Sequence, residues 1–194
     1  MIKRHAARVG LLVCLASLAV VMAGTLGSAS QQGSWLGNFS DRELKEVVIR
    51  LERTKCYGSC PAYKLTIHGN GRVVYIGEDN VKEKGKKHAR IGVDDVRRLV
   101  SEFERANYFS MNQYTDKDCS CVLCTDMPTA ITEIKVKGIA HRVEHYYGCT
   151  CPPPLLWELE QTIDKIVHAE QWTGDVSKQG PLGTACSNKQ KPKS

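Results

Sequence analysis

The chain has 194 residues and a formal net charge of +6 at pH 7, and 25% of its residues are charged. Removing residues 1–30 takes away three positive charges and no negative one, which lowers the net charge to +3. An excess this small does not predict nucleic-acid binding, which needs a concentrated basic face. The remaining length suits a single domain of about 100–150 residues.

Residues 1–30 are typical of a secretory signal peptide. Three basic residues come first, the apolar run Val9–Ala23 follows, and small residues stand at Ser28–Ser30. The apolar run has 15 residues, fewer than the ~20 that span a bilayer. We therefore expect cleavage and a periplasmic or secreted protein, which contacts the membrane only if this segment stays uncleaved.

A polar lead, residues 31–43, precedes the domain. The β-branched run Val47–Ile49, continued by Leu51, predicts a first strand over residues 44–53. We expect a single α+β domain over residues 44–170, followed by a disordered tail over 171–194, which is rich in Gly, Lys, Gln and Ser.

A β-hairpin with two cysteines at its open end dominates the sequence. Cys56 and Cys60 are separated by three residues and are followed by Pro61 and an alternating strand pattern that ends near His68. The turn Gly69-Asn70-Gly71 contains residues that tolerate a positive φ, and the chain then returns as a second strand.

Residues 77–91 are polar and extended, and they predict a short edge strand. The basic run Lys82–Arg90 is typical of a solvated edge that lysines protect, and we favour this interpretation over a binding patch. Apolar residues then recur at helical spacing over residues 93–106, with Asp94 and Asp95 in the first turn, where the helix dipole favours acidic groups.

The second half repeats the pattern of a hairpin and a helix. Residues 107–129 form a long connection, and strands over 130–136 and 140–147 flank the turn Lys137-Gly138. A proline-led helix is expected over residues 154–169. The order β-ββ-α-ββ-α predicts an α+β fold, in which a mostly antiparallel sheet carries two helices packed on one face.

The segment Leu51–Gly77, LERTKCYGSCPAYKLTIHGNGRVVYIG, resembles the signature of a bacterial family catalogued as domain of unknown function 6438. The likeness extends over roughly residues 44–168 and includes Thr125-Asp-Met-Pro-Thr129 and the closing helix. The resemblance implies an exported domain and carries no activity to transfer. The cysteines at 119, 121, 124, 149 and 151 are additional to the family pattern.

Eight cysteines follow the predicted signal, and an even number behind such a segment predicts disulfides. Eight cysteines allow 105 pairings, so the sequence alone leaves the connectivity open. The candidates are Cys56, Cys60, Cys119, Cys121, Cys124, Cys149, Cys151 and Cys186.

Hairpin geometry predicts that five of these sulfurs lie near one another. The residues before the first strand of an antiparallel hairpin lie beside those after the second strand. The cysteines of residues 119–124 should therefore approach Cys149 and Cys151. A disulfide cluster would tie the long connection to the last helix. The alternative is a tetrahedral zinc or copper(I) site with four thiolates, from Cys121, Cys124, Cys149 and Cys151.

Cys56 and Cys60 also allow more than one interpretation. A structural disulfide across the corner is the first. A copper site is the second, because Cys-x-x-x-Cys-Pro resembles the copper-binding loop of Sco-type chaperones, although the predicted element order differs from their thioredoxin-like fold. A thiol-redox role is the third.

No constellation in the sequence predicts an enzyme. His141 and His145 are four residues apart on one strand, about 13 Å, which is too far to share a metal. His68 and His88 are expected at the surface. No nucleophile elbow, phosphate loop or dinucleotide fingerprint occurs. We therefore expect a non-enzymatic binding or envelope-associated module without a cofactor, stabilised by disulfides, whose partner is a protein or a small molecule. The alternatives are a periplasmic zinc- or copper-binding protein and a thiol-redox protein.

Overall fold

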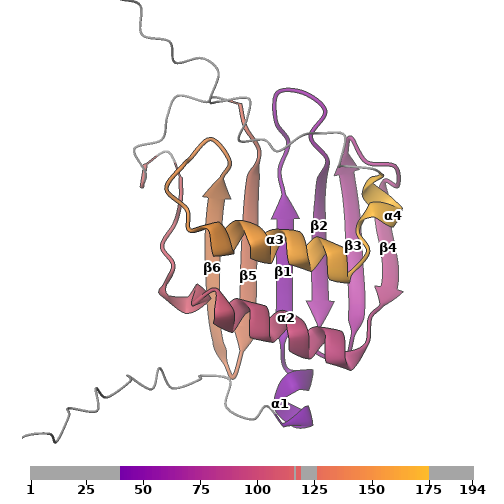
Figure 1. Ribbon diagram of the computed structural model, residues 1–194. Helices are drawn as coiled ribbons and strands as arrows, with labels where there is room; N and C mark the ends of the chain where they lie inside the picture. Colours follow the sequence, from indigo (N-terminus) through magenta and orange to yellow (C-terminus); the bar gives the residue numbers. More distant parts are fainter. Residues whose placement is uncertain (1–39, 116, 119–125, 175–194) are drawn as a thin grey trace, which may run out of the picture. The chain divides into compact units, whose positions relative to one another are not determined.

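The computed structural model describes residues 40–115, 117–118 and 126–174. They form an α+β fold with one six-stranded sheet in the order β4-β3-β2-β1-β5-β6, and every neighbouring pair is antiparallel. The predicted fold class is therefore confirmed (Figure 1). No helix in the described ranges has the length and apolar character needed to cross a bilayer.

The elements follow the predicted order, including the edge strand expected within residues 77–91, and short helices are added at both ends. The strands are β1 (Val48–Arg53), β2 (Ala62–His68), β3 (Arg72–Asp79), β4 (Gly85–Arg90), β5 (Thr129–Val136) and β6 (Ile139–Tyr146). The helices are α1 (Asp41–Lys45), α2 (Val93–Arg105), the 3₁₀ turn η1 (Tyr108–Ser110), α3 (Pro154–Ile166) and α4 (Glu170–Thr173).

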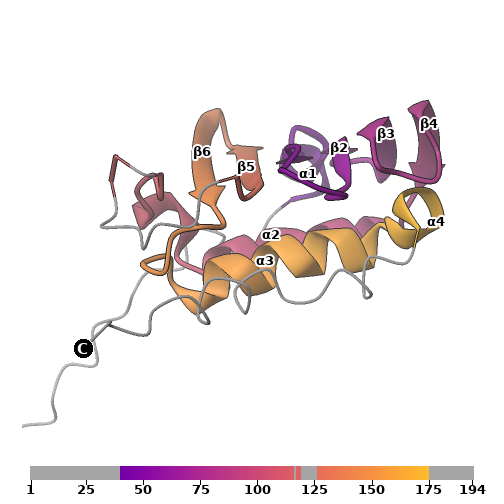
Figure 2. The ribbon, with the colours of Figure 1, turned by 90° about the horizontal axis from the view of Figure 1, so that it is seen from above.

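Helices α2 and α3 lie on the same face of the sheet and run across its strands (Figures 1 and 2). Their buried residues share one hydrophobic core with the strand residues that point toward them. From α2 the core receives Val96, Leu99, Val100 and Phe103, and from α3 it receives Leu156, Leu159 and Ile163. The spacing of these residues places them on one side of each helix, as the sequence predicted.

The turn between β2 and β3 uses its two glycines for different reasons. Gly71 has φ +83°, and its N–H donates to the carbonyl of His68, so a tight turn is followed by a left-handed residue. Gly69 is not left-handed, but a Cβ there would lie 1.6 Å from the carbonyl oxygen of Leu44. Of the three turn residues expected to tolerate positive φ, only Gly71 adopts it.

The predicted first strand, residues 44–53, was too long at its start. Leu44 and Lys45 belong to α1, and β1 begins at Val48. The helix has a capping box, in which the Glu43 N–H donates to the Ser40 hydroxyl oxygen and the Ser40 N–H donates to the Glu43 carboxylate. This Ser-x-x-Glu pattern was legible in the sequence, but the β-branched residues after it masked it.

The C-terminal helix is shorter than predicted and is followed by a further turn of helix. Instead of continuing to residue 169, α3 ends at Ile166, and His168 adopts φ +54° before α4 begins. Trp172 in α4 is buried and stacks on Tyr75 of β3, with ring centroids 4.8 Å apart. The packed unit therefore includes Trp172, two residues beyond the expected domain end.

Candidate functional site

The Cys56–Cys60 corner joins β1 to β2. The two cysteines form a disulfide with a Cα–Cα distance of 5.6 Å, as predicted for this pair. Asn80 fixes the loop, because its side-chain amide donates to the carbonyls of Gly58 and Cys60. Tyr57 projects from this closed loop with 91% of its surface exposed.

The second predicted cysteine cluster is described in part. Cys149 and Cys151 are both disulfide-bonded. The candidates Cys119, Cys121, Cys124 and Cys186 lie outside the described residues.

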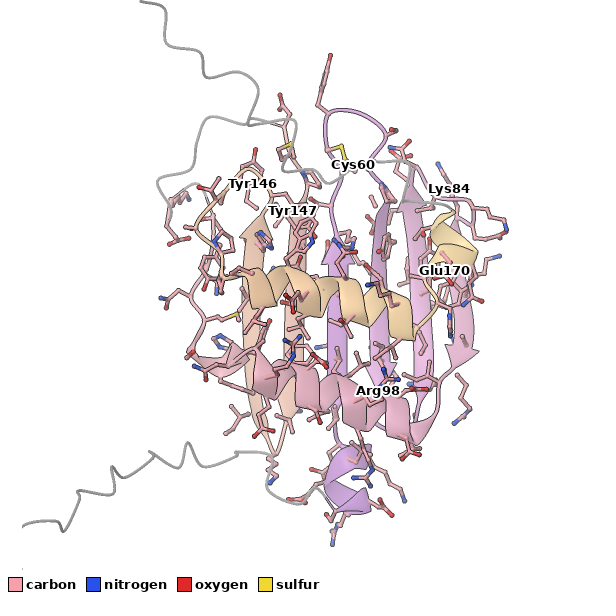
Figure 3. All side chains as sticks on the ribbon, viewed as in Figure 1. Cys60, Lys84, Arg98, Tyr146, Tyr147 and Glu170 are labelled. Carbon is pink, nitrogen blue, oxygen red and sulfur yellow. A yellow bond between two sulfur atoms is a disulfide. The ribbon has the colours of Figure 1, made fainter. Side chains whose placement is uncertain are left out.

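Residues 126–128 connect the two cysteine regions. The Tyr57 N–H donates to the carbonyl of Asp126, and the Tyr147 N–H donates to the carbonyl of Pro128. Figure 3 shows Cys60, Tyr146 and Tyr147 toward one end of the sheet, which we call the cysteine end.

A buried polar network lies at the cysteine end, between the sheet and α3. Arg53, the last residue of β1, donates from Nε (3.0 Å) and Nη2 (2.7 Å) to Asp164 Oδ2. The Tyr63 hydroxyl accepts from Arg53 Nε (3.0 Å) and donates to Asp164 Oδ1 (2.8 Å). Arg53 also donates to the Tyr147 hydroxyl. The Arg53 guanidinium of β1 thus contacts β2, α3 and the residue that follows β6.

The network continues to Glu160 of α3, which is fully buried. The Tyr147 hydroxyl donates to Glu160 Oε2 (2.8 Å), and His145 Nδ1 lies 2.9 Å from Oε1. Both carboxylate oxygens therefore have partners, which a buried carboxylate requires. The Trp157 ring packs against Tyr147, with centroids 4.6 Å apart, and shields this half of the network.

Burial and charge set the protonation states of the network. Burial raises the pKa values of Tyr63 and Tyr147 well above the usual range, and the carboxylates of Asp164 and Glu160, respectively, raise them further. Burial alone would lower the pKa of Arg53, but the charge of Asp164 and its neighbours raises it well above the usual value. The tyrosines are therefore neutral donors and the arginine is a permanent cation.

Sequence reasoning missed this network. His141 and His145 share a face of β6, as expected, but they have separate partners: His145 is buried against Glu160, and His141 Nε2 lies 2.9 Å from the Met111 carbonyl oxygen. Within the described ranges, no group of three or more His, Cys, Asp or Glu residues could hold a metal. Arg53 and Glu160 stand at apolar-face positions of β1 and α3, which is the signal that could have predicted a buried ion pair.

The buried tyrosines predict a loss of stability at alkaline pH. Burial raises the pKa of Tyr75 to about 12, and the charge of Glu83 contributes. The folded protein therefore keeps a proton that the unfolded chain releases near pH 10, so stability falls as the pH rises from about 10 to 12. Urea unfolding should give a free energy at pH 11 lower than at pH 8 by roughly 1 kcal/mol from Tyr75 alone. Tyr75→Phe should reduce that difference, and equal free energies at the two pH values would contradict the assignment.

The opposite face of the sheet, away from α2 and α3, is the second candidate. We call it the open face. The register assigns to it alternate residues of each strand: Lys86, His88 and Arg90; Arg72, Val74, Ile76 and Glu78; Lys64, Thr66 and His68; Val48, Arg50 and Glu52; Ile131, Glu133 and Lys135; and Ala140, Arg142, Glu144 and Tyr146. It combines charged groups with aliphatic side chains, and Ile76 is 37% exposed.

Every carboxylate on the open face has a cationic partner. Lys64 bridges Glu52 (3.3 Å) and Glu78 (3.1 Å). Arg50 pairs with Glu133, and Arg142 pairs with Glu144. Such exposed pairs contribute little to stability, but their three cations offset most of the charge of the four carboxylates on this face.

The cations Arg72, Lys86 and Arg90, on β3 and β4, have no carboxylate partner among the described residues. The pKa of the neighbouring His68 is lowered by burial and then by the charges of Arg72 and Arg50. The β3–β4 part of the open face therefore carries an uncompensated positive charge.

Comparison with known proteins gives one family. The model of the family described as "Domain of unknown function (DUF6438)" matches residues 47–167, which is more than half of the chain. No curated protein matches the chain.

Proposed function

Because the chain belongs to the DUF6438 family, whose description names no activity, we propose its function from its own geometry. The protein is an exported, non-enzymatic binding module, and its disulfides stabilise a rigid sheet that presents the open face to a partner. One face of the sheet packs on the hydrophobic core and keeps the sheet rigid, and the other face meets solvent and is available to a partner.

One observation carries this proposal: both long helices pack on the same face of a six-stranded sheet (Figure 2). The strands of the open face keep their side chains in fixed rows, because five antiparallel pairings set the register. A surface ordered in this way binds with little loss of conformational entropy, which is the main cost of association that a rigid scaffold avoids.

The buried network supports a binding role in preference to a catalytic one. Its hydroxyl, guanidinium and carboxylate groups bind one another, and its tyrosines are held neutral. The described residues place no hydroxyl or thiol nucleophile against His145. The network therefore fixes α3 to the strands, and the binding surface lies on the other side of the sheet.

The cysteines support export and a structural use of sulfur. Four described cysteines are disulfide-bonded, and disulfides persist in oxidising compartments. The disulfides at Cys149 and Cys151 support a structural use of sulfur in preference to the zinc or copper(I) alternative, which needs thiolates.

Intact-mass spectrometry of the protein isolated from its native host, alkylated without prior reduction, tests this assignment. We expect a chain without its N-terminal segment, with all eight remaining cysteines oxidised, no alkylation and no bound metal. Alkylated thiols together with bound zinc or copper would favour the metal-binding alternative. A full-length chain with every thiol alkylated would contradict export.

A further inference from the structure

We infer that the free edge of β4 binds an extended acidic segment of a partner protein, which adds to the sheet as a seventh strand. This inference rests on the proposed binding function and names the partner's chemistry. Strand addition uses backbone hydrogen bonds for affinity and alternate side chains for specificity.

The two edges of the sheet differ in how they are covered. At the β6 edge, the Tyr114 N–H donates to the Glu144 carbonyl (2.8 Å), and the Tyr146 N–H donates to the Tyr114 carbonyl (2.9 Å). Within the described part of the chain, β4 has no such cover, and its backbone pairs with β3 alone. Figure 1 shows β4 as the outermost strand on its side.

The register shows which backbone groups of β4 face outward. The Ile91 N–H donates to the Gly71 carbonyl, so Ile91 faces β3. In an antiparallel ladder alternate residues hydrogen-bond to the same neighbour, so Ala89 and Lys87 also face β3. Lys86, His88 and Arg90 therefore direct their backbone N–H and C=O groups to the free edge, and the side chains of these same residues lie on the open face.

The basic residues of β4, which we expected to protect the edge from pairing, would repel most added strands but attract an acidic one. Arg72 and Arg90 are directly opposite in the register, and like charges at such a position destabilise a sheet. Lys86 lies four residues from Arg90 on the same face, and neither has a carboxylate partner among the described residues. Acidic side chains on an added strand would stand beside Lys86, His88 and Arg90 and relieve this repulsion.

Charge also decides among the occupants of the edge. A second copy pairing β4 with β4 in antiparallel fashion would set these basic residues against one another. The C-terminal residues 175–194 contain four lysines and one aspartate, so this segment has the wrong sign. An anionic membrane laid on the open face would meet its four carboxylates. A separate acidic segment, bound along the edge, avoids all three conflicts.

Fluorescence anisotropy with a labelled peptide of alternating glutamate and threonine, eight residues long, tests the inference on the full mature chain. The peptide should bind, and binding should weaken as salt rises. Lys86→Glu/Arg90→Glu should weaken it about tenfold or more, because two attractions become repulsions. Lys45→Glu/Lys165→Glu makes the same change of charge at exposed residues of α1 and α3, away from the open face, and should leave the affinity within about twofold.

His88→Pro separates strand addition from simple charge attraction. Proline at position 88 removes one outward-facing N–H and leaves the hydrogen bonds between β3 and β4 intact. Edge strands tolerate proline at such outward-facing positions. Peptide binding should be lost in His88→Pro while its circular dichroism stays unchanged. The charge-reversed pair, whose side chains are exposed, provides the second test if His88→Pro unfolds.

Peptide binding that His88→Pro leaves unchanged would overturn the inference, as would tighter binding to phosphatidylglycerol vesicles than to the peptide. Absence of peptide binding would overturn it as well. None of these results bears on the proposed function. A partner that contacts the open face without pairing with β4 would still form an adduct with a photo-cross-linker placed at Ile76, which is 37% exposed on that face.

Discussion

Replacing Arg53 by leucine is expected to lower the free energy of unfolding by about 3–5 kcal/mol, the cost of breaking a buried ion pair by removing one partner. The Arg53 side chain is 11% exposed and Asp164 is 18% exposed. Without the guanidinium, Asp164 keeps only the Tyr63 hydroxyl, and the Tyr147 hydroxyl loses its donor. Urea unfolding followed by circular dichroism measures the difference.

Arg50→Leu provides the matched control on the same strand. Arg50 also forms an ion pair, with Glu133, but half of its side chain is exposed. Water and salt screen such a pair, so its loss should lower the free energy of unfolding by less than about 1 kcal/mol. If the two substitutions had equal effects, the network would not be the anchor of α3.

Replacing Gly71 by alanine should lower the free energy of unfolding by about 2–5 kcal/mol, because two penalties add. A φ of +83° is unfavourable for an L-residue by about 1–2 kcal/mol. In addition, the new Cβ would lie 2.3 Å from the Ile91 carbonyl oxygen, and relief of such an overlap typically costs about 1–3 kcal/mol. Thermal and urea unfolding of the variant measure the sum.

Gly138→Ala isolates the first penalty. Gly138 has φ +76° in the second hairpin, but a Cβ there would meet no atom within 4 Å. In this variant the free energy of unfolding should fall only by the cost of the positive φ, about 1–2 kcal/mol. Equal losses at Gly71 and Gly138 would show that the β2–β3 turn moves away from Ile91 at no cost.

The hairpins and long helices were predictable because their residues repeat with simple periods. Tyr63, Leu65 and Ile67 alternate, and Leu99 and Phe103 recur at helical spacing, so each element carries its own signal. The turn Lys137-Gly138, with positive φ at both residues, is likewise a local feature. The α+β class followed from the order of these elements.

The buried network was not predictable by the same reasoning, because its members meet only in the folded chain. Arg53 and Asp164 are 111 residues apart, and apolar periodicity does not show which charged residues share a core. Arg53 continues the alternation of Ile49 and Leu51, and Glu160 stands four residues after Leu156. Those positions indicate burial of a charge but do not identify its partner.

The most direct test of the binding role is photo-cross-linking in the native host. A benzoylphenylalanine is placed at Ile76 on the open face or at Val93 on α2, two aliphatic positions of similar exposure, 37% and 45%. We expect a discrete adduct from Ile76 and none from Val93. An adduct from Val93 alone, or none from either position, would contradict the claim that the open face is the binding surface.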